Sequence, residues 1–91
     1  MARMVTAFKV GKVYRVEWLD HHDVSQTWVR AEDIPEDQEV RFVSIGLCIK
    51  NEKMYVTLAG TEEIVKTGTP TYGNVFRCLK ADIQSAREIK L

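Results

Sequence analysis

The segment Val13-Tyr14-Arg15-Val16-Glu17-Trp18-Leu19-Asp20 decides the fold class of this 91-residue chain. Tyr14, Val16 and Trp18 alternate with charged side chains. Successive side chains of an extended strand leave opposite faces, so this alternation is typical of a β-strand that is buried on one face. The segment therefore predicts a sheet with one covered face. It contains no catalytic motif.

The same alternation recurs along the chain and predicts a small β-domain. Besides a first strand over residues 9–20, we expect strands over residues 39–50, 53–59, 74–79 and 86–91, with a single helical turn over residues 80–84. This order predicts an all-β fold, a small SH3-like or Sm-like antiparallel barrel with one short helical turn. The barrel domain spans residues 10–91, after a flexible N-terminal tail of residues 1–9. The residues expected in or near the core are Tyr14, Val16, Trp18, Ile45, Leu47, Val56, Leu58 and Ile83.

The charge balance limits the kinds of partner. The chain has 13 Lys and Arg and 13 Asp and Glu, whereas a protein that binds duplex DNA through many phosphates usually has a clear basic excess. Eight acids lie between Glu17 and Glu39, with Arg30 as the one Lys or Arg in that range. Nucleic acid is therefore the less favoured partner.

The sequence also indicates where the protein is found. It has no apolar stretch long enough to predict a membrane segment, and its two cysteines are too few for a disulfide framework. We therefore expect a cytoplasmic protein.

Catalytic and metal-binding residue patterns are weak in this sequence. The adjacent histidines in His21-His22-Asp23 would leave opposite faces of an extended chain, so they do not converge on one ion as zinc requires. The serines lie in no nucleophile-elbow sequence, and neither Cys48 nor Cys78 has a neighbouring base. We therefore predict a protein that is not an enzyme and has no metal and no cofactor.

The best candidate for a ligand site is the segment from Lys66 to Arg77, which begins in the turn-rich loop over residues 60–73 and continues into the following strand. It combines cations, hydroxyls, an aromatic ring and glycines, the groups that a compact, doubly charged cyclic dinucleotide would need. Trp28 adds a second aromatic face for a base or a protein partner. The other interpretation is an ordinary connection between strands. The candidate ligand-binding residues are Trp28, Lys66, Thr69, Thr71, Tyr72 and Arg77.

The strand over residues 39–50 also predicts self-association. It is apolar on both faces, and a small single-layer barrel buries only one of them. Val40 and Phe42 would then be covered by another copy of the chain, as in a two-fold homo-oligomer. The alternative is that the loop over residues 60–73 folds over this face.

An ordered set of short segments resembles a group of small, largely uncharacterised tailed-phage proteins. The resemblance covers roughly residues 10 to 91. Two departures concern the loops: family members often have small residues where this chain has His21-His22, and often have a proline where this chain has Leu79 or Lys80. The matching segments are Val16-Glu17-Trp18-Leu19-Asp20, Trp28, Glu32-Asp33, Val43-Ser44-Ile45-Gly46, Val56-Thr57-Leu58-Ala59, Leu79-Lys80-Ala81-Asp82-Ile83 and Ile89-Lys90-Leu91.

The resemblance implies a function that the residues alone do not specify. Some phage proteins of this size sequester cyclic-nucleotide immune signals, so the chain is expected to be an anti-CBASS sponge that binds a cyclic nucleotide and acts in the host cytoplasm. Two alternatives remain open. One is a nucleic-acid-binding small barrel, since Sm-like and SH3-like barrels often bind RNA or DNA. The other is a protein-interaction module of the phage or its host.

Overall fold

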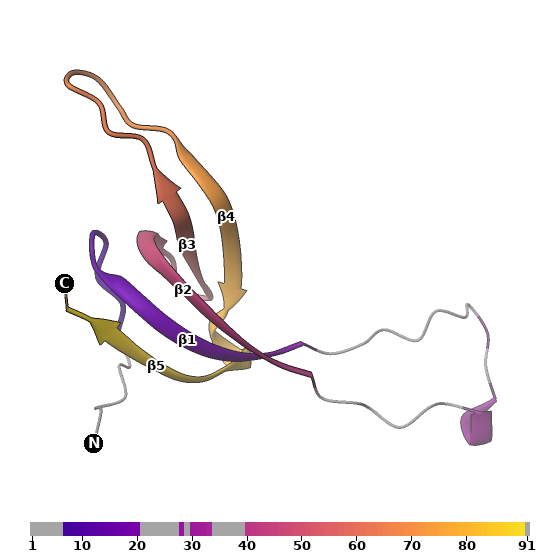
Figure 1. Cartoon of the computed structure of the whole chain (residues 1–91). Helices are drawn as coiled ribbons and strands as arrows, with labels where there is room; N and C mark the ends of the chain where they lie inside the picture. Colours follow the sequence, from indigo (N-terminus) through magenta and orange to yellow (C-terminus); the bar gives the residue numbers. More distant parts are fainter. Residues whose placement is uncertain (1–6, 21–27, 29, 34–39, 91) are drawn as a thin grey trace.

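The computed structural model describes residues 7–20, 28, 30–33 and 40–90, and it is an all-β protein. Five antiparallel strands form one sheet in the order β4-β3-β2-β1-β5 (Figure 1). The predicted all-β class is confirmed, and the sheet is not closed, so β4 and β5 are its two edges. The elements are β1 (Val13–Asp20), η1 (Ala31–Asp33), β2 (Val40–Asn51), β3 (Tyr55–Glu62), β4 (Tyr72–Leu79), η2 (Lys80–Asp82) and β5 (Ile83–Ile89).

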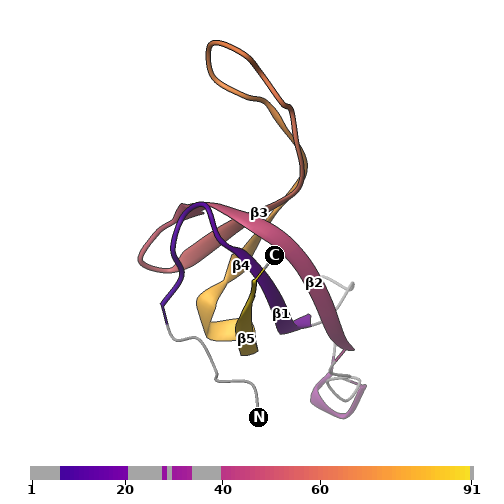
Figure 2. The ribbon, with the colours of Figure 1, turned by 60° about the vertical axis from the view of Figure 1, so that its left-hand side comes forward.

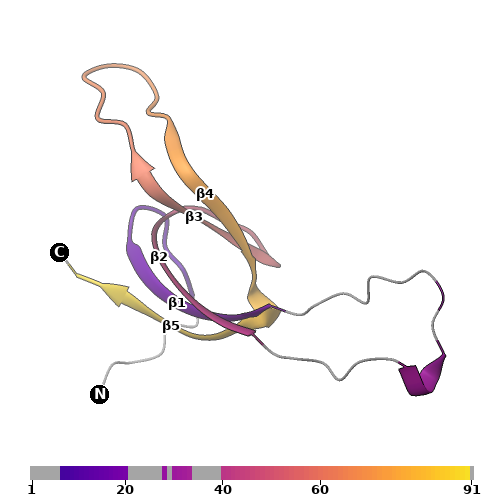
Figure 3. The same cartoon turned by 45° about the vertical axis from the view of Figure 1, so that its right-hand side comes forward.

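Several boundaries differ from those predicted. The helical turn η2 ends at Asp82, so β5 begins at Ile83, earlier than the predicted start at residue 86. The strands β3 and β4 continue into the region predicted as a loop, and their connection shrinks to residues 63–71. Figure 3 shows this hairpin projecting from the rest of the sheet. Threonines and glycines are tolerated there because a two-stranded ribbon has little side-chain packing to satisfy.

The core lies on the concave side of the sheet, which curls around it (Figure 2). We call this side the inner face. Phe8, Tyr14, Val16, Cys48, Val56, Leu58, Cys78 and Ala86 form its buried cluster, and Trp18, Phe76 and Ile83 pack against them. The ring of Trp18 stacks on Phe42, with centroids 4.8 Å apart, and its indole nitrogen donates a 3.0 Å hydrogen bond to the Ser44 hydroxyl.

The prediction that Ile45 belongs to the core is wrong, because β2 turns its other face inward. The side chain of Ile45 is 56% exposed and that of Leu47 is half-buried, whereas Cys48 is fully buried. Tyr14 lies opposite Gly46 across the β1–β2 pair, where the glycine leaves room for the large ring. A side chain at Gly46 would also collide with β3, since a Cβ there would lie 3.0 Å from the Leu58 Cβ. Close strand packing thus selects the face of β2 with the small residues.

The segment before β1 closes one end of the core. Phe8 is buried and meets Tyr14 edge-on, with ring centroids 4.9 Å apart. The Lys9 amide donates a 2.8 Å hydrogen bond to the Tyr14 hydroxyl, and the Asn51 side chain donates one of 2.9 Å to the Phe8 carbonyl. Phe8 and Lys9, which the sequence assigned to a tail, are therefore held against the sheet. Residues 1–6 and His21-His22 lie outside the described residues.

Candidate functional site

Part of the predicted ligand site comes together at the tip of the β3–β4 hairpin. Lys66 and Thr69 are exposed in the connection, and Tyr72 begins β4 with 38% of its surface exposed. The Thr71 hydroxyl and amide both donate to the Glu63 carboxylate, at 3.3 and 3.4 Å. An acid therefore occupies the donors that would bind a phosphate.

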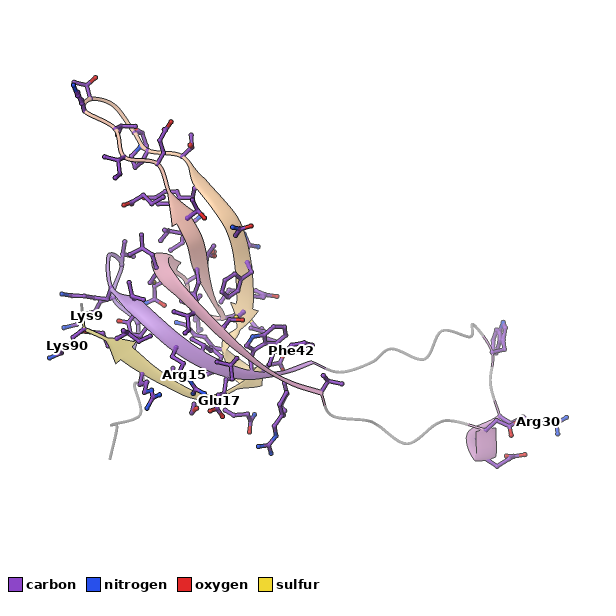
Figure 4. The ribbon with its side chains drawn as sticks, in the orientation of Figure 1. Lys9, Arg15, Glu17, Arg30, Phe42 and Lys90 are labelled. Carbon is purple, nitrogen blue, oxygen red and sulfur yellow. The ribbon has the colours of Figure 1, made fainter. Side chains whose placement is uncertain are left out.

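The remaining two residues of that predicted site lie elsewhere. Arg77 is five positions beyond Tyr72 in β4, roughly 17 Å along a strand and on the opposite face. Its guanidinium lies over the Tyr55 ring, 5.6 Å from the centroid. Trp28 is 91% exposed and lies two positions before Arg30, which Figure 4 shows far from the sheet. A single copy of the chain thus does not assemble the six predicted residues into one site.

The described residues offer little for catalysis or metal binding. Burial raises the pKa of the Cys48 thiol and that of the Cys78 thiol, so neither is activated as a nucleophile. Within the described ranges no group of three or more His, Cys, Asp or Glu side chains is placed to hold a metal ion. No helix in the same ranges is long and apolar enough to cross a membrane.

The convex side of the sheet, which we call the outer face, carries an unbroken apolar row. Five residues that face one another across successive strand pairs form it, one from each strand. All five alternate with inward residues of their strands, so their side chains point away from the core. In strand order from β5 to β4, the apolar row consists of Ile89, Val13, Leu47, Ala59 and Val75.

Large aliphatic side chains of this face remain in solvent. Val75 in the row is 50% exposed, and beside the row Ile45 is 56% and Val43 52% exposed. Single exposed apolar residues are common on proteins, but Val43 and Ile45 are neighbours on one face of the central strand β2, and clustered exposed aliphatic residues are typical of an interaction surface.

A pocket of about 420 Å³ adjoins one end of the apolar row. Val13 and Ile89, the row residues of β1 and β5, line it together with Gly11, Lys12, Glu88 and Lys90. Lys9 and Lys90 lie at this same end of the sheet (Figure 4). The pocket therefore combines an aliphatic wall with two lysines, Lys12 and Lys90, and one glutamate, Glu88.

Arginines surround the exposed aliphatic side chains. Arg15 in β1 lies between Ile45 of β2 and Arg87 of β5 in the sheet register. Its guanidinium forms a 2.8 Å ion pair with Glu17 on the same face (Figure 4). The hydrogen bond from Arg15 is the largest cause of the lowered pKa of Glu17, and the nearby charge of Arg41 lowers that pKa further.

The sequence contained a partial signal for the outer face. The alternation of Val43, Ile45 and Leu47 was visible, but both faces of that strand are apolar, and the pattern alone did not tell which one is covered. The position of Arg15 directly opposite Arg87 depends on the pairing of β1 with β5. Residue spacing gives no indication of that register.

Comparison with family models, with curated proteins and with solved structures finds no match to this chain.

Proposed function

We propose that this chain is a non-catalytic binding domain that docks onto a protein partner through the outer face. The observation that carries the proposal is the set of exposed aliphatic side chains on the outer face, Val43 and Ile45 in the central strand β2 and Val75 in the edge strand β4. Aliphatic side chains in that position are unfavourable in water, and burying one against a partner is worth about 1.5–3 kcal/mol. The surrounding arginines form a polar rim, as in protein interfaces generally.

The test uses selection of random peptides on the immobilised full chain. Peptides that bind should lose at least about tenfold in affinity when Ile45 is replaced by Asp, which removes one buried aliphatic anchor and introduces a charge. Ile64→Asp is the matched control, because Ile64 is 97% exposed in the hairpin connection, away from the outer face. Circular dichroism and a thermal melt verify the fold of both variants. Failure to select any peptide, or equal binding by parent and Ile45→Asp, contradicts the proposal.

We also propose that the curled sheet is a small SH3-like or Sm-like barrel that stays open between β4 and β5. The strand order and the short turn η2 between the two edge strands support this interpretation.

The resemblance to tailed-phage proteins stays a prediction, as does a homo-oligomer in which a second copy covers Val40 and Phe42. Phe42 is 41% exposed and stacks on Trp18, which leaves part of its ring available to a second copy. Light scattering that gives a mass near 10.5 kDa would contradict the oligomer.

A cyclic-nucleotide sponge remains the second candidate function. The pair formed by Arg77 and Tyr55 favours it, because a guanidinium beside an aromatic ring can meet both a phosphate and a base. Cyclic dinucleotides at one hundred times the dissociation constant should add ~2.7 kcal/mol of apparent stability in a thermal-shift screen. Arg77→Ala and Tyr55→Ala, which remove the two members of that pair, should abolish the shift. A screen without any shift contradicts the sponge and leaves the protein-docking proposal intact.

A further inference from the structure

The outer face has more positive charge than its own carboxylates neutralise. Its strand positions include Arg15, Arg41, Arg77 and Arg87, and Glu17 is the acid that lies among them. The whole chain is neutral, so this excess results from sorting of charge between surfaces and not from composition. Sorted charge of one sign attracts a partner surface of the opposite sign.

The clearest conflict is between Arg15 and Arg87, which face each other directly across the β1–β5 pair. Like charges at directly opposed positions of an antiparallel pair destabilise the sheet. Glu17 pairs with Arg15 at 2.8 Å, whereas Arg87 is exposed and has no ion pair with any described residue. A carboxylate supplied from outside would relieve this repulsion, and the free protein retains it.

The chemistry between the cations favours a protein over a nucleic acid. A surface for single-stranded nucleic acid presents aromatic side chains on which bases stack. Here Val43, Ile45 and Val75 occupy the exposed positions. The one outward ring beside them, Tyr55, lies under the Arg77 guanidinium. Aliphatic side chains need an apolar partner, and the pocket against Val13 and Ile89 can take one such side chain, with Lys12, Lys90 and one acid, Glu88, at its margin.

We infer that the partner of the outer face is an acidic polypeptide segment that also carries apolar side chains. This inference rests on the proposed function and specifies its ligand. The apolar side chains of the segment lie along the apolar row, and one of them enters the pocket. Its carboxylates meet Arg87 and the lysines Lys12 and Lys90.

The experiment compares three libraries of short random peptides on the immobilised full chain. All contain the same apolar residues, and they differ in carrying Asp and Glu, Lys and Arg, or only Ser and Gly beside them. An oligo(dT) single strand is the nucleic-acid probe. We expect Ile45-dependent binders from the acidic library alone, with affinity reduced about tenfold by Arg87→Gln. Lys66→Gln removes the same charge from the hairpin connection and should leave binding unchanged.

Each other outcome overturns a defined part of the argument. Ile45-dependent binders that come equally from the basic or the uncharged library refute the acidic partner and preserve the docking function. Binding of oligo(dT) that is lost in Arg87→Gln, without acidic binders, shows a nucleic-acid surface instead. If no library yields an Ile45-dependent binder, the docking function itself fails.

Discussion

Replacing Arg87 with Gln should stabilise the folded protein, although it removes a charged residue from a strand. Arg87 lies directly opposite Arg15, and such pairs have Cβ atoms roughly 4.5–5.5 Å apart. A like-charge pair at this separation destabilises the sheet by about 0.2–1 kcal/mol, so the substitution should raise the free energy of unfolding by that amount. For a domain of this size that gain corresponds to a rise in Tm of roughly 1–8 °C. Arg87→Glu should stabilise further, because it turns the repulsion into an attraction.

The assay is urea and thermal unfolding of the parent and both variants at low salt and at about 1 M NaCl. The Debye length falls to ~3 Å in the concentrated salt, so the gain should shrink there. Arg77→Gln is the matched control, since it removes an arginine of the same face that lies opposite the uncharged Thr57. The Arg77→Gln variant should therefore be no more stable than the parent. If Arg87→Gln is no more stable than the parent at low salt, the two guanidinium groups are not in conflict, and the electrostatic argument for an acidic partner is wrong.

Three further predictions concern the sheet itself. Gly46→Ala should destabilise the fold by about 1–3 kcal/mol in urea unfolding, because the new Cβ would lie 3.0 Å from both the Ala59 carbonyl oxygen and the Leu58 Cβ. Thr57→Val should leave stability unchanged or raise it in the same assay, since the buried Thr57 hydroxyl has no hydrogen-bond partner among the described residues, and a loss above about 1 kcal/mol would contradict this. The lowered pKa of Glu17 should add stability above the usual glutamate pKa of ~4.3, and this stability is lost as the pH falls through the lower folded-state value. Arg15→Gln should flatten that acid limb of the pH–stability profile, and an unchanged limb would refute the coupling.

The sequence was sufficient for the fold class because the signal is local. Alternation in the first strand put Tyr14 and Val16 on the covered face, and the structure buries both. The failure at Ile45 has a physical cause: both faces of β2 are apolar, and the choice between them depends on which strand packs beside Gly46. Steric fit between strands that are far apart in the chain does not change the alternation of apolar residues in the sequence, so the pattern could not predict it.

The candidate surface was less accessible to sequence reasoning than the fold. Turn-forming residues around Lys66 predicted a ligand-binding loop. The structure has an exposed hairpin tip there, and the Thr71 hydroxyl donates its hydrogen bond to the Glu63 carboxylate. The outer face is built from residues contributed by all five strands, and the register of the strand pairs determines which of these residues are neighbours. Arg15 and Arg87 are unremarkable surface residues until the first and last strands are known to pair.

The pairing of β1 with β5 also governs how the chain is made. β1 spans Val13–Asp20, yet its partner on one side begins at Ile83, so this pair can form only after residue 83 has been synthesised. Until then one edge of β1 has unpaired backbone groups, and the inner-face residues Tyr14 and Val16 lack the cover that Ala86 provides. A fragment that ends before residue 83 should therefore leave this edge of β1 unpaired and fail to complete the sheet.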